Sequence, residues 1–177
     1  PVLKELGFDD EQWAWILAAF ALGYALFQVP GGWLADKLGP RAVLTTVVSL
    51  WSLFTLLTGT AYRFGTMFIY RLLFGAGEAG AFPGMSRAVF SWIPMKERGI
   101  VQGINFSGSR VGAALALPLM VALMNGFEWG EFTFEGLGWR KSFFLLAVIG
   151  FVVAGIWYWW FRNDPSEHSG VSEEELE

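Results

Sequence analysis

Arg71 and Glu78 are the two charged residues of the stretch YRLLFGAGEAGAFPG. They stand seven residues apart, and in an α-helix that spacing puts both side chains on one face, about 10.5 Å apart along the axis. Exclusion from water disfavours the charged form of a carboxylate, which can then take up a proton, whereas an arginine stays charged. The pair is therefore suited to proton transfer beside a bound anion. The alternative is a structural ion pair that joins two helices.

Polar residues in two other predicted helices reach a similar depth. At 1.5 Å per residue, Tyr24 and Glu78 lie roughly 18–20 Å from the outer ends of their helices, and Arg110 lies roughly 16 Å from the cytoplasmic end of its helix. All three are therefore near the middle of a bilayer core about 30 Å thick. A charge at that depth costs roughly 2.5–3.5 kcal/mol on insertion scales, so it normally faces a cavity or a partner. Glu78 is the only acidic residue in any predicted span, which makes it the candidate proton carrier.

The polar layer supplies candidate ligands for an organic anion. Gln28 lies one turn beyond Tyr24, and Asn105 and Ser109 add hydrogen-bonding groups near Arg110. Arg110 has a second interpretation, as a structural partner of Glu78. The predicted binding residues are Tyr24, Gln28, Arg71, Asn105, Ser109 and Arg110.

Five long segments carry these residues. Of the 177 residues, 54% are hydrophobic and only 16% are charged, against roughly 25% charged in a soluble domain. About 20 apolar residues are enough to cross the bilayer as a helix. Buried helices of a soluble protein are a poor alternative, because five such lengths would leave no polar outer layer. We therefore predict an all-α membrane protein with five transmembrane helices, over residues 13–34, 42–62, 64–92, 99–127 and 140–161.

Composition also excludes several kinds of site. The chain has no cysteine and a single histidine, His168, so we expect no disulfide, no cofactor and no multi-histidine metal site. The net charge of −4 gives no indication of nucleic-acid binding. No His-Glu-x-x-His or Gly-x-Ser-x-Gly motif is present, and we expect no enzyme activity.

The basic residues predict an orientation. Six lysines and arginines fall on one side of the predicted membrane and four on the other, a modest positive-inside bias. It places the N-terminal end and the 128–141 loop outside. Residues 162–177 are polar and acidic, and we expect a solvated cytoplasmic segment there.

Small residues and prolines predict how the helices meet. Gly80 with Gly84, and Gly108 with Gly112, form Gly-x-x-x-Gly steps that are typical of helix contacts. Pro83 and a second proline, Pro118, are expected to bend their helices.

The stretch GGWLADKLGPR, here called the signature segment (residues 31–41), follows the first predicted span. Taken alone it reads as a polar turn with interfacial charges. As a whole it resembles the signature loop of the major facilitator superfamily, Gly-x-x-x-Asp-(Arg/Lys)-x-Gly-(Arg/Lys)-(Arg/Lys). Pro40 departs from the basic residue usual there. The resemblance implies a gating role for Gly32, Asp36, Lys37, Gly39 and Arg41.

Four further stretches narrow the resemblance. RLLFGAGEAGAFPG, WIPMKERG, GINFSGSRVGAALALPLM and GWRKSFFLLAVIG are similar to the anion:cation symporter branch, which includes bacterial hexuronate, aldonate and aldarate transporters and sialin-like carriers. That resemblance implies a twelve-helix protein, of which this chain would be a fragment with helices 2–6 of the N-terminal six-helix bundle. The first helix and the C-terminal half would be its missing partners, and 162–177 would begin the central cytoplasmic loop.

The branch also implies residue roles. Glu78 matches its proton-coupling glutamate, Arg71 an arginine used in coupling or anion binding, and Tyr24 a substrate-contacting tyrosine. Ser109 aligns with a substrate-contacting position. The expected function is proton-coupled symport of a small organic anion, such as a sugar acid, through the inner or plasma membrane into the cell. Sodium coupling and a membrane sensor that binds a similar anion without moving it are the alternatives.

Overall fold

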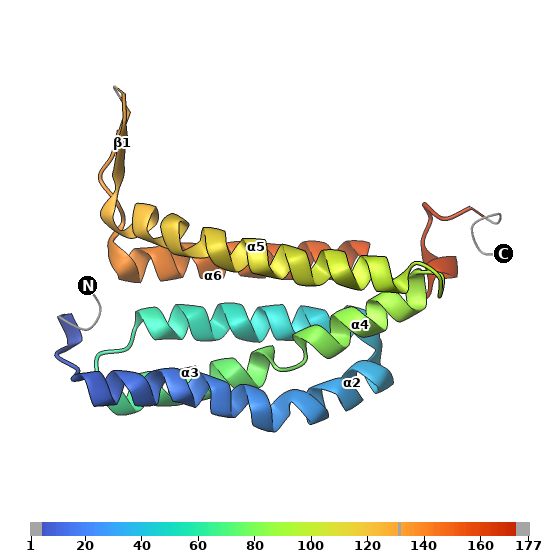
Figure 1. Cartoon of the computed structure of the whole chain (residues 1–177), viewed down its shortest axis with the longest axis horizontal. Helices are drawn as coiled ribbons and strands as arrows, with labels where there is room; N and C mark the ends of the chain where they lie inside the picture. The colour runs from blue at the N-terminus through green and yellow to red at the C-terminus, as the bar shows by residue number, and fades with distance from the viewer. Residues whose placement is uncertain (1–4, 131, 173–177) are drawn as a thin grey trace.

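The computed structural model describes residues 5–130 and 132–172. The described elements run lengthwise beside one another, and a small hairpin and a short 3₁₀ helix lie at opposite ends (Figure 1). The elements are α2 (Asp10–Gly59), α3 (Phe64–Glu78), α4 (Ala81–Trp92), α5 (Arg98–Asn125), β1 (Phe127–Trp129), β2 (Phe132–Phe134), α6 (Gly138–Trp160) and η1 (Pro165–Glu167).

Helix α2 consists of two arms joined at a sharp turn. Asp9 caps its start by accepting a 2.7 Å hydrogen bond from the Gln12 amide. At Gly39 the backbone turns to φ 77° and ψ 161°, a conformation open to glycine but strained for other residues. The first arm (10–38) and the second arm (40–59) correspond to the predicted spans 13–34 and 42–62.

The span predicted over 64–92 consists of two helices with a short break between them. Helix α3 ends at Glu78 and α4 begins at Ala81. Pro83 has no N–H to donate to the carbonyl of Ala79, so the hydrogen-bond ladder cannot run through this point. The bend expected at Pro83 is therefore present, whereas α5 stays continuous past Pro118.

Glycines let the helices approach closely. A Cβ at Gly23 would overlap the Leu72 carbonyl oxygen, and a Cβ at Gly75 would overlap the Phe20 carbonyl oxygen. These two glycines bring the first arm of α2 against α3. The predicted contact role holds for Gly80 and Gly84, whose surroundings are close-packed, whereas Gly108 and Gly112 on α5 have no such neighbour within 4 Å among the described atoms.

The helices form layers in Figure 1. The first arm of α2 and α3 lie on one side, the second arm of α2 lies in the middle, and α5 with α6 lies on the other side. Helix α5 contains no buried residue and contacts mainly α6 and α4. It is thus the least enclosed helix of the described chain.

An apolar cluster and a basic side chain close one end of the bundle. Ile16, Ala61, Met67 and Trp139 form the cluster. Beside it, Arg140 donates hydrogen bonds of 2.7 and 3.2 Å to the carbonyls of Gly59 and Ala61. These contacts join α2, α3 and the start of α6 at the end predicted to be outside.

The loop predicted over 128–141 contains a hairpin instead of irregular chain alone. Strands β1 and β2 pair antiparallel, with Phe127 opposite Phe134 and Trp129 opposite Phe132. Aromatic residues favour strands, and Gly130 supplies a positive φ of 61° at the turn.

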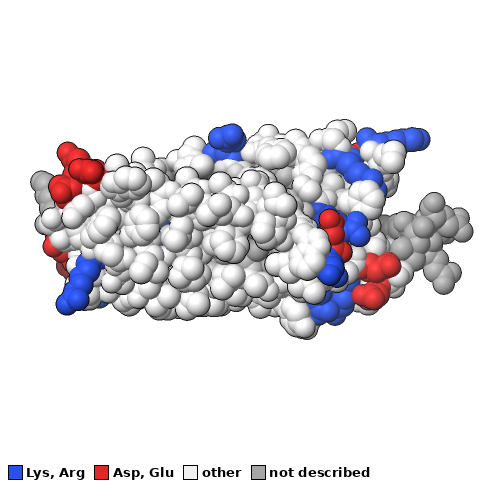
Figure 2. All heavy atoms as spheres, turned by 90° about the horizontal axis from the view of Figure 1, so that it is seen from below, with Lys and Arg blue, Asp and Glu red and all other residues white. Residues whose placement is uncertain are grey.

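The surface has the distribution expected for a lipid-facing bundle. Figure 2 shows charged side chains gathered at the two ends, with a broad uncharged belt between them that one basic patch interrupts. Three described helices are long and apolar enough to cross a membrane: α2, α5 and α6. Helices α3 and α4 are shorter, with 15 and 12 residues, so the count of five spans stays a prediction.

Candidate proton and anion site

Helix α3 carries the two charged residues with which the sequence argument began. Arg71 and Glu78 are both half-buried, and Glu78 is the last residue of the helix. The Glu78 carboxylate lies within electrostatic range of Arg71 and of the Tyr24 side chain on α2. These three residues from two helices therefore form one group.

Arg71 and Glu78 do not form a direct ion pair. Within residues 5–130 and 132–172, the ion pairs at 4.0 Å or less join Arg87 to Asp36 and Arg140 to Glu5. The Nε of Arg71 is buried and has no hydrogen-bond partner among the described groups. The Arg71 Nε is therefore a buried donor to which an acceptor could bind.

An aromatic frame holds this group in place. The Phe20 ring lies 6.0 Å from the Tyr24 ring and 5.5 Å from the Phe74 ring. The Arg71 guanidinium carbon lies 5.8 Å from the centre of the Phe74 ring, within cation–π range. Sequence reasoning missed Phe20 and Phe74, although each stands within one helical turn of a predicted site residue.

The remaining predicted ligands lie apart from this group. Gln28 is exposed on the first arm of α2. Asn105 is half-buried and lines an apolar cavity of about 500 Å³ with residues of α2, α4 and α6, such as Leu44, Met85 and Trp157. Ser109 and Arg110 are exposed on α5, and no described ion pair joins Arg110 to Glu78.

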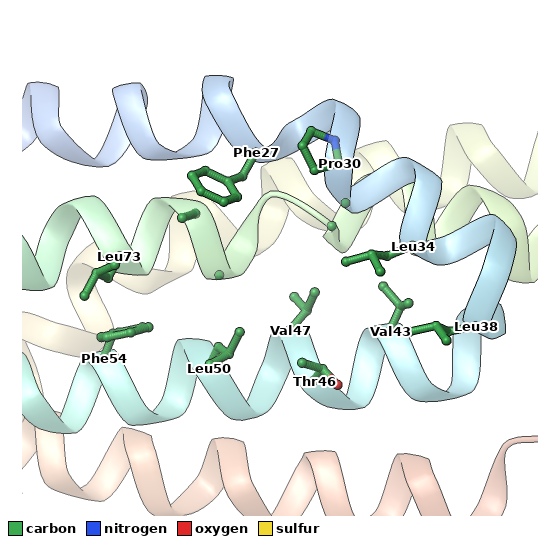
Figure 3. Close-up of a pocket in the computed structure, with 14 residues that line it drawn as sticks. Phe27, Pro30, Leu34, Leu38, Val43, Thr46, Val47, Leu50, Phe54 and Leu73 are labelled. Carbon is green, nitrogen blue, oxygen red and sulfur yellow. The ribbon is translucent and has the colours of Figure 1, made fainter.

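A second cavity lies beside the polar group but is itself apolar. It has a volume of about 390 Å³ and is bounded by both arms of α2 and by α3. In Figure 3, Phe27 and Pro30 of the first arm face Leu50 and Phe54 of the second arm across it. Its few polar groups make it unsuited to an organic anion, because desolvating the charge would not be compensated there.

The signature segment lies at the opposite end of the bundle from Arg140 and the apolar cluster beside it. Asp36 lies 3.8 Å from the Nε of Arg87 on α4, and the Lys37 ammonium lies 4.1 Å from the centre of the Trp33 ring. Gly39 forms the turn, and Gly32 packs at ordinary distance against Pro83. Arg41 donates a 2.8 Å hydrogen bond from its Nε to the carbonyl of Tyr158 on α6.

No group of three or more His, Cys, Asp or Glu within the described ranges could hold a metal ion. The chemistry available at the site is that of one carboxylate, one guanidinium and one phenol.

This chain is similar in sequence to several proteins that are named as transporters. The Probable galactarate/D-glucarate transporter GarP of Escherichia coli K12 is 38% identical over 99% of this chain and 38% of its own length. The Probable sulfoacetate transporter SauU of Cupriavidus necator is 34% identical over 99% of this chain and 39% of its own. The Hexuronate transporter of Bacillus subtilis is 29% identical over 94% of this chain and 37% of its own.

A solved structure supports the same fold. A bacterial homologue of the human lysosomal transporter Spinster, in an inward-facing and unoccupied conformation, superimposes with a TM-score of 0.72 at 26% identity. The match covers 93% of this chain and 38% of that one. The chain thus spans well under half the length of the proteins it resembles.

These findings confirm the predicted all-α membrane class. The relatives are named as transporters, in agreement with the expectation of a transporter instead of an enzyme. The whole chain, residues 1–177, matches one family. The chain belongs to the Major Facilitator Superfamily.

Proposed function

We propose that the chain is the N-terminal part of a secondary transporter that moves an organic anion into the cell together with protons. The observation that carries the proposal is the group formed by Glu78, Arg71 and Tyr24 within apolar helices. A carboxylate in such surroundings is costly, and ionisable groups inside membranes typically serve ion or proton movement.

The energetics of anion uptake require a coupling ion. An anion that enters a cell with a negative interior works against about 2.3 kcal/mol per charge for each 100 mV of membrane potential. Protons that enter with the anion reverse that cost, provided that a titratable group in the pathway binds and releases them. Glu78 is the acidic residue that the spans predicted from the sequence offer for this step.

The substrate class follows from the arginine and from the relatives. Guanidinium groups bind carboxylates and other oxyanions through two parallel hydrogen bonds, and the buried Nε of Arg71 has no partner among the described groups. The substrates in the names of the relatives are galactarate, D-glucarate, hexuronate and sulfoacetate, all organic anions. We therefore propose a sugar acid as the substrate, with Tyr24 as a second contact.

The proposal also includes further binding residues, a location in the membrane and a gating loop. Gln28, Asn105, Ser109 and Arg110 contribute to the same anion-binding cavity in the whole transporter. The protein lies in the inner or plasma membrane, and residues 162–177 lie in the cytoplasm. The signature segment acts as a gating loop at the cytoplasmic side.

The test is uptake by the full-length transporter in proteoliposomes. D-galactarate, D-glucuronate and sulfoacetate would each be offered under an inward proton gradient, under an inward sodium gradient, and without a gradient. The proposal expects uphill accumulation of a sugar acid with the proton gradient. Accumulation driven by the sodium gradient alone would show that sodium, and not the proton, is the coupling ion. Binding of one of the three anions without uptake would favour a membrane sensor.

A further inference from the structure

The chain that follows α6 folds back onto the end of the bundle that carries the signature segment. We call residues 161–171 the strap. They include η1, which Asp164 caps by accepting a 2.9 Å hydrogen bond from the Ser166 amide. Phe161, the last residue of the span predicted over 140–161, is buried, and His168 is half-buried although the sequence predicted a solvated segment over 162–177.

One strap residue clamps the turn of the signature segment. The Asn163 side-chain oxygen accepts a 2.9 Å hydrogen bond from the backbone amide of Arg41. The same side chain lies so close to Gly39 that a Cβ there would approach its atoms to 2.5–2.6 Å. Gly39 is thus required for its positive φ and for the approach of Asn163.

The Arg41 side chain adds a second attachment to α6. Its Nε donates to the Tyr158 carbonyl at 2.8 Å, and its guanidinium carbon lies 4.3 Å from the centre of the Tyr158 ring. The Arg41 backbone is therefore bound to the strap, and the Arg41 side chain is bound to α6.

The strap also binds the end of α4. The Trp92 indole N–H donates a 2.9 Å hydrogen bond to the Arg162 carbonyl. The His168 ring lies edge-on to two indoles, with centroids 5.6 Å from Trp92 and 5.3 Å from Trp160. The strap thereby joins α4, α6 and the turn between the arms of α2.

The other end of the signature segment is held far more loosely. The Asp36 side chain is 77% exposed, and its ion pair with Arg87 is long, at 3.8 Å. Lys37 is exposed and contacts the Trp33 ring of its own helix. The segment is therefore fixed at Arg41 and open at Asp36 and Lys37.

We propose that the strap is a positioning device for the gate: Asn163 fixes the Arg41 end of the signature segment to α6, so that Asp36 and Lys37 are presented at a constant position to the other half of the transporter. The gating role rests on the proposed function, whereas the clamp itself is a property of this chain. No step of transport passes through Asn163, which acts through the segment that it holds.

The test compares Asn163→Ala with Asn163→Asp in the full-length transporter. Hydrogen exchange of the Arg41 amide reports the clamp without any substrate. Loss of one hydrogen bond to a partly exposed group should raise that exchange about fivefold in Asn163→Ala, whereas the aspartate keeps an acceptor and should restore slow exchange. Trp92→Phe, which removes the indole donor and keeps a ring, should loosen residues 162–168 in the same assay.

Transport is measured on the same variants with D-galactarate. Asn163→Ala should lower the initial uptake rate at unchanged equilibrium binding, and Asn163→Asp should restore the rate. Ser169→Ala, an exposed change within the strap, is the matched control and should alter neither measurement.

Three results would overturn the inference. They are unchanged Arg41 exchange in Asn163→Ala, failure of Asn163→Asp to restore it, and faster exchange with an unchanged uptake rate. A wild-type protein that does not take up any organic anion would instead refute the proposed function, and the exchange result would still decide whether the clamp exists.

Discussion

At the scale of single residues, two features of the Arg71 guanidinium bear on the proposed anion binding. It lies beside an aromatic ring in an apolar helix pair, and its buried Nε has no hydrogen-bond partner among the described groups. A buried donor without a partner costs about 1–3 kcal/mol. In the proposed function, a carboxylate of the substrate would supply the missing acceptor beside a Glu78 that forms no direct ion pair with the arginine.

Arg71→Lys tests this account of anion binding. Lysine keeps the charge but not the planar fork, so we expect binding of D-galactarate to weaken about tenfold or more, in line with the loss of one charge-assisted hydrogen bond. Equilibrium binding to the purified full-length transporter measures the change. Arg63→Lys, at an exposed helix start, is the matched control and should bind as the wild type does. Equal affinities for Arg71→Lys and the wild type would remove Arg71 from the site.

At the scale of elements, the site depends on a close crossing of α2 and α3. Gly23 and Gly75 let the two backbones meet, and that contact sets the depth of Tyr24 against Arg71 and Glu78. The break after Glu78 leaves this residue at the end of a half-helix, next to the point where Gly31 and Gly80 pack backbone to backbone.

Gly75→Ala should destabilise this crossing. The new Cβ would overlap the carbonyl of Phe20, which belongs to the backbone and cannot move aside, so we expect a loss of about 1–3 kcal/mol in the free energy of unfolding. Gly65→Ala, on the same helix with no neighbour within 4 Å, should be neutral or stabilising. Unfolding of the purified protein in increasing denaturant measures both. Equal stability of the two variants would contradict the crossing.

The capping of η1 by Asp164 within the strap should depend on pH. A backbone hydrogen bond from the Ser166 amide and a 2.8 Å bond from the Ser166 hydroxyl both hold the pKa of Asp164 below its ordinary value. Because the pKa is lowered in the folded state, these bonds stabilise η1 at pH values above the ordinary aspartate range, and their contribution is lost as the pH falls through the folded pKa.

Carboxyl-selective NMR of the full-length transporter, with Asp164→Asn for assignment, measures this shift. Ser166→Ala removes the hydroxyl donor and should raise the pKa of Asp164 towards its ordinary value, while the amide bond remains. An Asp164 that titrates at the ordinary value in the wild type would show that η1 is not capped in this way.

At the scale of the whole molecule, apolar run lengths and prolines predicted the helical class and the bend at Pro83, since both depend on local chemistry. They could not predict the position of the strap. His168 looks like a solvated residue in sequence, and only tertiary contact brings it against Trp92 and Trp160. The exposure of α5 and of Arg110 shows the same limit, because the burial of a helix depends on tertiary contacts and not on its local chemistry.

The two ends of the bundle are built differently, which bears on the coupling role proposed for Glu78. One end is closed by the Arg140 contacts with the carbonyls of Gly59 and Ala61, and the other carries the strap and the signature segment. Glu78 is the last residue of α3, and Figure 1 shows the passage from α3 to α4 between these two ends. In the proposed cycle its protonation state decides whether the loaded transporter can change the side to which it opens.

Glu78→Gln in the full-length transporter tests that claim most directly. The amide keeps the size and hydrogen-bonding capacity of the side chain but cannot release a proton at neutral pH. In proteoliposomes with an inward proton gradient, we expect the variant to lose uphill accumulation of D-galactarate and to retain exchange of internal for external substrate. Glu97→Gln, at an exposed position, is the control and should accumulate substrate as the wild type does. Uphill accumulation by Glu78→Gln would contradict the account, because the proton would then travel by another group.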